Sequence, residues 1–233
     1  MGIMSRYSLI FTMLLAAVAA WPSRAGTIDW VEWTATDPDV LGTVTLLNAS
    51  TVQVAFSGGI SGACTGDAVC ATYWSPAGTY ESSPTVDNAP PGGLLEITGG
   101  GSSVYTFTFG TPVVDPVIGI VSMGGSGTPV EYDFSAPFTI LNSGAGYFGH
   151  GPDLYAPAAT QLIGSESNGI IGFTGTFSSI TFAAPVYEDW QDVTVGIPDA
   201  EQTPEPGVWG MALAGMGVLG ALRLKRRVRQ ESR

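Results

Sequence analysis

The sequence predicts an all-β fold, a two-sheet antiparallel β-sandwich flanked by an N-terminal signal helix and a C-terminal transmembrane helix. The 233 residues include 32 Gly and 16 Pro, which excludes a long-helix or coiled-coil protein. Between residues 27 and 198, short apolar runs alternate with a period of two, and no run keeps the 3.6-residue period of an amphipathic helix. Because 45% of the residues are hydrophobic, the composition also excludes intrinsic disorder.

The clearest strand covers residues 104–109, where Tyr105, Phe107 and Phe109 alternate with Val and Thr. This alternation predicts a half-buried antiparallel strand with its aromatic face toward the core. Gly, Pro, Asn or Asp separates nearly all such runs, as turns require. The same pattern predicts strands at Ile28–Thr34, Thr43–Leu47, Thr51–Ser57, Leu94–Thr98, Val117–Met123, Val130–Phe134, Phe138–Leu141, Gly169–Thr174, Thr176–Phe182 and Asp192–Ile197.

These strands are assigned to one passenger domain, residues 26–198. About eleven short strands in about 175 residues favour a two-sheet sandwich, with jelly-roll connections as one arrangement and a closed barrel as the alternative. The Gly99–Gly101 run and the stretch Ser75–Gly93, which contains four prolines, are expected to be exposed loops.

The charges divide the chain sharply. Residues 26–222 contain no Lys or Arg, whereas all acidic residues except Glu231 lie there, beside the single His150. Such a body cannot neutralise phosphates, which excludes nucleic acids and anionic lipid head groups as its partners. We therefore expect neutral or cationic partners, and internal salt bridges only through His150 or a free amino terminus.

The first 25 residues are typical of a secretory signal peptide. Arg6 precedes an apolar run, Tyr7–Ala20, and small residues surround a cleavage bond between Ala25 and Gly26. Cleavage after Ala20 is the competing site. An uncleaved anchor is the alternative, although fourteen apolar residues are short for a membrane span. Export would place the body outside the cytoplasm.

That compartment favours a local disulfide between Cys64 and Cys70, which enclose five residues. A metal site would need more Cys or His nearby, and the chain has one His. The closed loop is short, so its expected contribution is about 2 to 3 kcal/mol.

The C-terminal part has three regions in a fixed order. An acidic, Pro-containing linker, residues 199–206, ends in Pro204-Glu205-Pro206, and residues 207–224 are predicted to form a transmembrane helix. A buried core helix is the alternative, but such helices are rarely apolar all round. The basic tail, residues 225–233, is expected to stay in the cytoplasm under the positive-inside rule. The basic residues that would stop translocation are Arg223, Lys225, Arg226, Arg227 and Arg229.

This ordered combination resembles the PEP-CTERM sorting signal, over Thr203–Arg233. In that family an exosortase, a membrane-embedded, cysteine transpeptidase-like enzyme of Gram-negative bacteria that make exopolysaccharide, reads the signal. The resemblance implies that Pro204, Glu205 and Pro206 are the recognition site. It also implies export by the general secretion machinery, transient anchoring in the inner membrane with the C-terminus in the cytoplasm, and release to the cell surface or beyond. The position before the motif is often Val and is Thr203 here.

Two parts of the body, Tyr105–Met123 and Gly169–Ile197, resemble a recurrent passenger domain of PEP-CTERM proteins. The resemblance is carried by Thr108–Val117, Gly172–Ile180 and the segment from Trp190 to Gly196. It implies a β-sandwich of unknown biochemical activity.

The sequence offers few catalytic candidates, so no enzyme is expected. His150 is the one base available to a Ser-His-Asp mechanism, and no Gly-x-Ser-x-Gly elbow accompanies it, so an exposed loop histidine is the simpler interpretation. Glu188 and Asp189 beside Trp190 and Tyr187 could form a glycosidase pair, but nineteen acidic residues make such neighbours common.

Ligand binding is the other class of candidate. Asp37, Asp39, Asp189 and Asp192 could bind calcium where sandwich loops converge, although plain solvated loops explain them as well, and no cofactor is otherwise expected. Aromatic residues could stack on an uncharged extracellular polysaccharide, although most of them suit core or sheet-face packing. The aromatic residues in question are Trp30, Trp33, Trp74, Trp190, Tyr73, Tyr80 and Tyr187.

The sequence therefore predicts an exported, exosortase-processed protein of the cell surface or extracellular matrix, with a non-enzymatic structural or adhesive role linked to exopolysaccharide or biofilm. A carbohydrate-binding or calcium-binding β-sandwich module is the alternative. A secreted hydrolase comes third, because it requires a pocket with convergent carboxylates.

Overall fold

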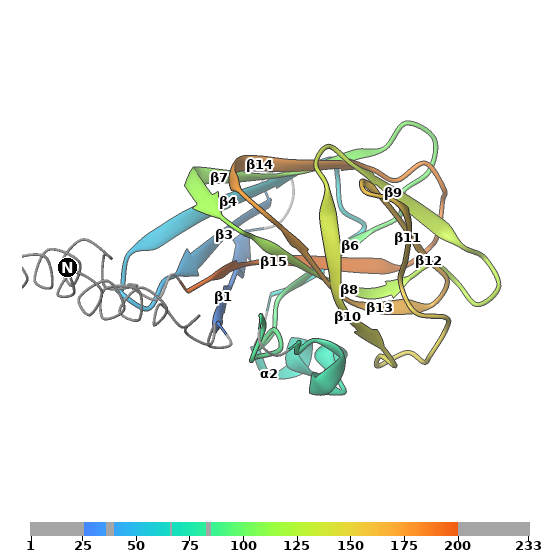
Figure 1. Ribbon diagram of the computed structural model, residues 1–233, viewed down its shortest axis with the longest axis horizontal. Helices are drawn as coiled ribbons and strands as arrows, with labels where there is room; N and C mark the ends of the chain where they lie inside the picture. Colours follow the sequence, from blue (N-terminus) through green and yellow to red (C-terminus); the bar gives the residue numbers. More distant parts are fainter. Residues whose placement is uncertain (1–25, 36–39, 66, 83–84, 200–233) are drawn as a thin grey trace, which may run out of the picture.

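The computed structural model describes residues 26–35, 40–65, 67–82 and 85–199 (Figure 1). This part of the chain is all-β and forms two antiparallel sheets. None of the helices within it is long and apolar enough to cross a membrane. The predicted signal peptide, the transmembrane helix at 207–224 and the basic tail lie outside the described residues.

The first sheet has seven described strands, and β1 (Ile28–Trp30) pairs with β15 beside the main path. The order along that path is β10 (Phe138–Gly144), β13 (Ser167–Phe173), β8 (Val117–Met123), β15 (Gln191–Pro198), β6 (Leu94–Ile97) and β5 (Gly62–Cys64).

The second sheet has eight described strands. Their order is β11 (Tyr155–Ala158), β12 (Gln161–Gly164), β9 (Val130–Phe134), β14 (Thr176–Ala183), β7 (Val104–Val114), β4 (Thr51–Ser57), β3 (Val40–Thr45) and β2 (Glu32–Ala35). Both described orders are open rather than circular, which favours the predicted sandwich over a closed barrel.

Most predicted strands are present, but the run predicted as one strand at Ile28–Thr34 is divided. Its first part is β1 in the first sheet, and its second part is β2 in the second sheet. Val31 lies between them, and its N–H donates to the Val195 carbonyl at 3.1 Å. A continuous apolar run suits either sheet, so the sequence pattern alone does not show where a chain crosses between them.

Three short strands, β5, β11 and β12, were not predicted. They have only three or four residues each, and Pro157 lies within β11. So few residues show too little alternation for a period of two to be recognised, and Pro further weakens a strand pattern.

The core between the sheets is rich in aromatic residues. Tyr105, Phe107 and Phe109 are all buried, as their alternation predicts. The ring of Phe107 lies 4.8 Å from that of Phe56, and the ring of Tyr132 lies 4.9 Å from that of Phe182, measured between centroids. Each side chain of this kind contributes about 1.5 to 3 kcal/mol through burial. A core of this size explains how a body without Lys or Arg can fold.

The outer face of the first sheet is covered by residues 67–82 and 85–93, here called the cover segment. It contains α2 (Asp67–Cys70), η1 (Ala71–Trp74) and η2 (Ala77–Thr79). Figure 1 shows α2 on the opposite side of the molecule from β7 and β14. The cover segment supplies a second buried cluster, in which its own side chains pack against sheet residues such as Val117 and Val121.

The prediction that Ser75–Gly93 is an exposed loop is therefore wrong for much of the stretch, although residues 75–78 are exposed. Tyr80 and Val86 are fully buried, and Trp74 just before the stretch is 2% exposed. The physical reason lies in β8, whose seven residues are all buried, so both of its faces need a packing partner.

Hydrogen bonds and a disulfide hold the cover segment in place. The Asn142 side-chain amide donates to the carbonyls of Gly78 and Glu81, both at 2.6 Å. The predicted disulfide between Cys64 and Cys70 is confirmed, with an S–S distance of 2.01 Å and a Cα–Cα distance of 5.7 Å. It joins β5 to α2 and so fixes the start of the cover segment.

Candidate functional site

Strand β15 connects two different ends of the described body. Trp190 directly precedes the strand and Asp199 directly follows it. An antiparallel strand of this length spans about 25 Å. We call the end at Pro198 and Asp199 the tether end, because the chain continues from there into the linker. We call the end at Trp190 the distal end.

At the tether end the first and last described residues lie side by side. Ile28 pairs with Pro198, and the Asp199 N–H donates to the Thr27 carbonyl at 2.8 Å. Gly26, the residue predicted to follow signal cleavage, accepts a hydrogen bond from the Asp87 N–H at 3.3 Å. Ala25 lies outside the described residues. The chain therefore enters and leaves the described body at the same end.

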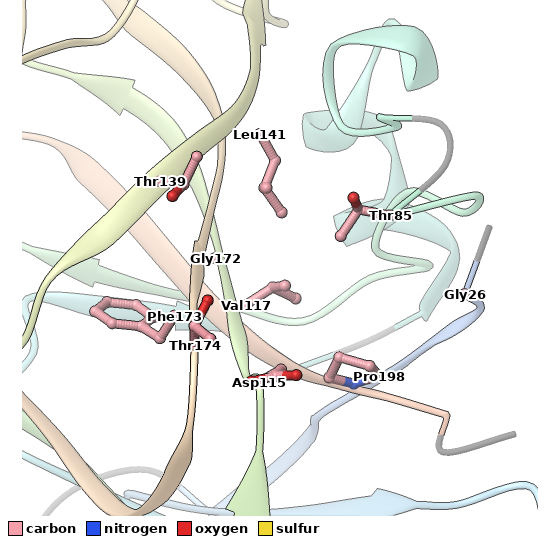
Figure 2. Close-up of a pocket in the computed structure, with 10 residues that line it drawn as sticks. All are labelled: Gly26, Thr85, Asp115, Val117, Thr139, Leu141, Gly172, Phe173, Thr174 and Pro198. Carbon is pink, nitrogen blue, oxygen red and sulfur yellow. The ribbon is translucent and has the colours of Figure 1, made fainter. Parts of the chain in front are cut away.

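An open groove of about 420 Å³ lies at the tether end (Figure 2). Its lining residues are Gly26, Thr85, Asp115, Val117, Thr139, Leu141, Gly172, Phe173, Thr174 and Pro198. Asp115 is the one carboxylate among these residues, and its Oδ1 accepts the Gly175 N–H at 2.7 Å. Glycoside hydrolysis needs two facing carboxylates, which this lining does not supply.

Aromatic side chains from three separate segments meet at the distal end, and we call them the distal aromatic cluster. They are Tyr73 from η1, Tyr147 and Phe148 from the loop after β10, and Trp190. The centroids of Phe148 and Trp190 are 4.1 Å apart, and those of Tyr73 and Tyr147 are 5.1 Å apart. Tyr147 is 52% exposed, and the other three are half-buried. The cluster forms a partly exposed apolar patch.

The buried carboxylate Asp192 lies directly behind this cluster. Its Oδ1 accepts a hydrogen bond from Trp190 Nε1 at 3.1 Å, whereas its buried Oδ2 has no protein partner. Asp192 is 0% exposed and pairs across the sheet with Glu96 on β6. Burial, followed by repulsion from Glu96, raises the pKa of Asp192 to about 8. No Lys or Arg between residues 26 and 222 could pair with it.

Further carboxylates surround the cluster. Burial raises the pKa of Glu188, and the nearby charges of Glu166 and Asp189 raise it further, against hydrogen bonds from the backbone that lower it. Glu166 Oε1 accepts the Ser122 hydroxyl at 2.8 Å, and Asp189 Oδ1 accepts the Tyr187 hydroxyl at 2.6 Å. The distal end thus combines aromatic rings with a negative electrostatic potential.

The candidate calcium residues do not form one described site. Asp37 and Asp39 lie outside the described residues. Asp189 is exposed and Asp192 is buried. Among residues that the structure describes, no three His, Cys, Asp or Glu side chains come close enough together to hold a metal ion. Calcium binding stays a prediction.

The aromatic residues considered for sugar stacking fall into two groups. Trp30, Trp33, Trp74 and Tyr80 are buried and serve packing. Tyr73 and Trp190 belong to the distal aromatic cluster. Tyr187 lies three residues before Trp190 in the sequence and is 61% exposed. The rings of Tyr73 and Trp190 are inclined at 79°, so they do not form the coplanar row expected of a flat sugar platform.

Sequence reasoning missed Tyr147, Phe148 and Glu166 as parts of this end. The available signal was an adjacent pair of aromatic residues between Gly146 and Gly149, outside any alternating run. His150 follows this pair and is exposed, as expected of a loop histidine.

A family model for the PEP-CTERM protein-sorting motif matches residues 202–227. The chain carries this sorting motif. The match contains Pro204, Glu205 and Pro206 and confirms the resemblance inferred from the residues. It identifies an exported protein that is targeted to an exosortase. No curated protein and no solved structure matches the chain, so the resemblance of the body to a passenger domain stays a prediction.

Proposed function

We propose that this protein is a structural or adhesive component of the cell surface or extracellular matrix, without enzymatic activity, and that it acts in association with exopolysaccharide. The observation that supports the proposal most is the PEP-CTERM motif at residues 202–227, which directly follows a disulfide-linked β-sandwich body. An extracellular scaffold needs a stable body and an export address, and this chain has both.

The arrangement of the two ends supports an adhesive role. Ile28 and Pro198 are paired, so the linker leaves from the same end at which the mature chain would begin. While the C-terminal segment holds the protein at the membrane, the distal end is then directed away from it. The distal aromatic cluster would be presented to the surroundings during that stage.

Carbohydrate binding is the second candidate, and the distal aromatic cluster is the observation that favours it. Tyr147 of the cluster is 52% exposed, and Tyr187, three residues before Trp190, is 61% exposed. Aromatic rings of this kind pack against the C–H faces of sugars. A secreted hydrolase has less support, because the groove at the tether end is lined by a single carboxylate. Calcium binding, predicted from Asp37, Asp39, Asp189 and Asp192, is compatible with either role.

The mass of the mature protein tests the sorting proposal. In the native host we expect a product that lacks the apolar segment and the basic tail, and in a strain without exosortase we expect both to be retained. The variant Glu205→Gln changes the motif, whereas Glu201→Gln changes an acidic residue just outside the matched range and serves as the control. Retention of the apolar segment in the native host would show that the tail is merely a membrane anchor.

A further inference from the structure

We propose that the distal end binds a cationic glycan, a polysaccharide whose sugars carry free amino groups, through the distal aromatic cluster and the carboxylates around it. This inference rests on the proposed role at the cell surface and names the ligand class of that surface. Three features support it, namely the exposure of the rings, the carboxylates beside them and the lack of Lys and Arg between residues 26 and 222.

The aromatic rings provide the apolar part of the surface. Tyr147 forms its exposed edge at 52% exposure, and it packs edge-to-face on Phe148, with centroids 4.9 Å apart. Phe148 in turn packs against Trp190 and Tyr73. Because neighbouring rings fix one another, a ligand that contacts Tyr147 meets a preorganised surface and costs little side-chain entropy.

The carboxylates provide the charge. Burial raises the pKa of Glu188, and repulsion from the charges of Glu166 and Asp189 raises it further. Glu188 Oε2 is buried and lacks any protein donor, so no protein group offsets its charge. A neutral sugar would leave this repulsion unchanged. An ammonium group has three donors and a positive charge. It would donate to the exposed Asp189, offset the repulsion among the carboxylates and be attracted to the faces of the rings.

The rest of the body also favours a cationic ligand over an anionic one. Between residues 26 and 222 there is no Lys or Arg that could compete for these carboxylates. A polyanionic glycan would be repelled by the whole body, whereas a polycation would be attracted before contact. The aromatic cluster then determines where on the body the polycation is held.

The test compares two oligosaccharides of equal length and linkage, one of glucosamine units and one of N-acetylglucosamine units. Titration calorimetry with the protein purified from its native host, in mildly acidic low-salt buffer, measures both affinities. We expect the glucosamine oligosaccharide to bind at least about tenfold more tightly, and its affinity to fall as salt is added.

Variants locate the site. Tyr147→Ala and Glu188→Gln are each expected to weaken binding of the glucosamine oligosaccharide about tenfold. Tyr155→Ala removes a tyrosine of β11 that is 61% exposed, and Asp87→Asn removes an exposed acidic residue near the tether end. These two controls should leave the affinity unchanged. The melting temperatures of all four variants are measured to confirm that each is folded.

Three results would overturn the inference. Equal affinity for the two oligosaccharides would leave carbohydrate binding in place but exclude a cationic preference. Equal losses from Glu188→Gln and Asp87→Asn would show unspecific attraction to the acidic body. The absence of binding by both probes would remove the glycan site altogether. The mass of the mature protein is measured independently, so the sorting proposal can stand or fall separately.

Discussion

The two ends of β15 are built by different kinds of contact. At the tether end the strand pairs with β1 through backbone hydrogen bonds. Because Gly196 of β15 has no side chain, the side chains of Ile28 and Trp30 on β1 can approach its backbone closely. At the distal end, side chains from distant segments meet, and carboxylates without cationic partners lie among them. Backbone pairing makes the tether end rigid, whereas the distal end combines fixed rings with an unbalanced charge suited to a ligand.

The largest expected effect concerns the close approach at the tether end. A Cβ at Gly196 would lie 2.7 Å from Trp30 Cε3 and closer still to Ile28, so Gly196→Val should separate β1 from β15. We expect the free energy of unfolding to fall by about 3 kcal/mol, measured by urea denaturation. The control is Gly110→Ala, where a Cβ meets only ordinary contacts from 3.4 Å. A loss below about 1 kcal/mol in Gly196→Val would mean that β1 is not needed to close this end.

Removal of the disulfide tests how the distal end is held. Cys64–Cys70 fixes α2, and the η1 segment that follows carries Tyr73 into the distal aromatic cluster. The double variant Cys64→Ser, Cys70→Ser should lower the free energy of unfolding by about 2 kcal/mol. The change in tryptophan fluorescence on ligand addition should also be smaller than in the parent protein, because Tyr73 is held less firmly against Trp190. Unchanged stability would show that hydrogen bonds such as that from Asn142 to the Gly78 carbonyl hold the cover segment without the disulfide.

The pH dependence of stability reports on Asp192. Its folded-state pKa of about 8 lies above the ordinary value of 3.8, so the protonated form favours folding. This contribution is complete below about pH 4 and is lost as the pH rises through about 8. The raised pKa values of Asp29 and Glu188 act in the same direction.

The variant Asp192→Asn keeps an oxygen that can accept the Trp190 indole N–H but cannot ionise. We expect it to be more stable than the parent protein by about 2 kcal/mol above about pH 8, and to lack the loss of stability on alkalisation. Thermal unfolding across the pH range measures both. A parent protein whose stability does not fall as the pH rises would contradict a buried, unpaired Asp192.

Added salt should have the smallest effect. With nineteen carboxylates and no Lys or Arg in residues 26–222, self-repulsion weakens the folded body. Moderate salt or a divalent cation is therefore expected to raise the melting temperature by a few degrees, by screening. The effect should be smaller in Glu188→Gln than in Asp87→Asn, because Glu188 is repelled by the charges of Glu166 and Asp189. A melting temperature that falls with salt would contradict this.

The sequence predicted the strand content well, because alternation is a local property. The bounds of β4, β8 and β9 agree with the predicted runs. It failed where a role depends on a distant partner. The Pro-rich Ser75–Gly93 has no strong pattern of its own, and its burial follows from the apolar outer face of β8, whose seven consecutive residues are all buried.

The candidate site was predicted only in part. Trp190, Tyr73, Glu188 and Asp189 attracted attention as residue types. Glu188 and Asp189 were considered as a glycosidase pair, and Asp189 also as a calcium ligand. The groove and the carboxylates lie at different ends of β15. No spacing rule relates Tyr73, Phe148 and Trp190, since three separate segments must fold before their rings touch.

By itself, the sequence determined the all-β character, the cation-free acidic body, the cysteine pair and the sorting motif at 202–227. Each of these is a property of composition or of neighbouring residues. Only the tertiary structure decided that Gly26 and Asp199 lie at one end, that the cover segment is buried, and that the aromatic rings meet Asp192 at the other end. The reason is that these contacts depend on which strands pair, and pairing is set by burial across the whole body.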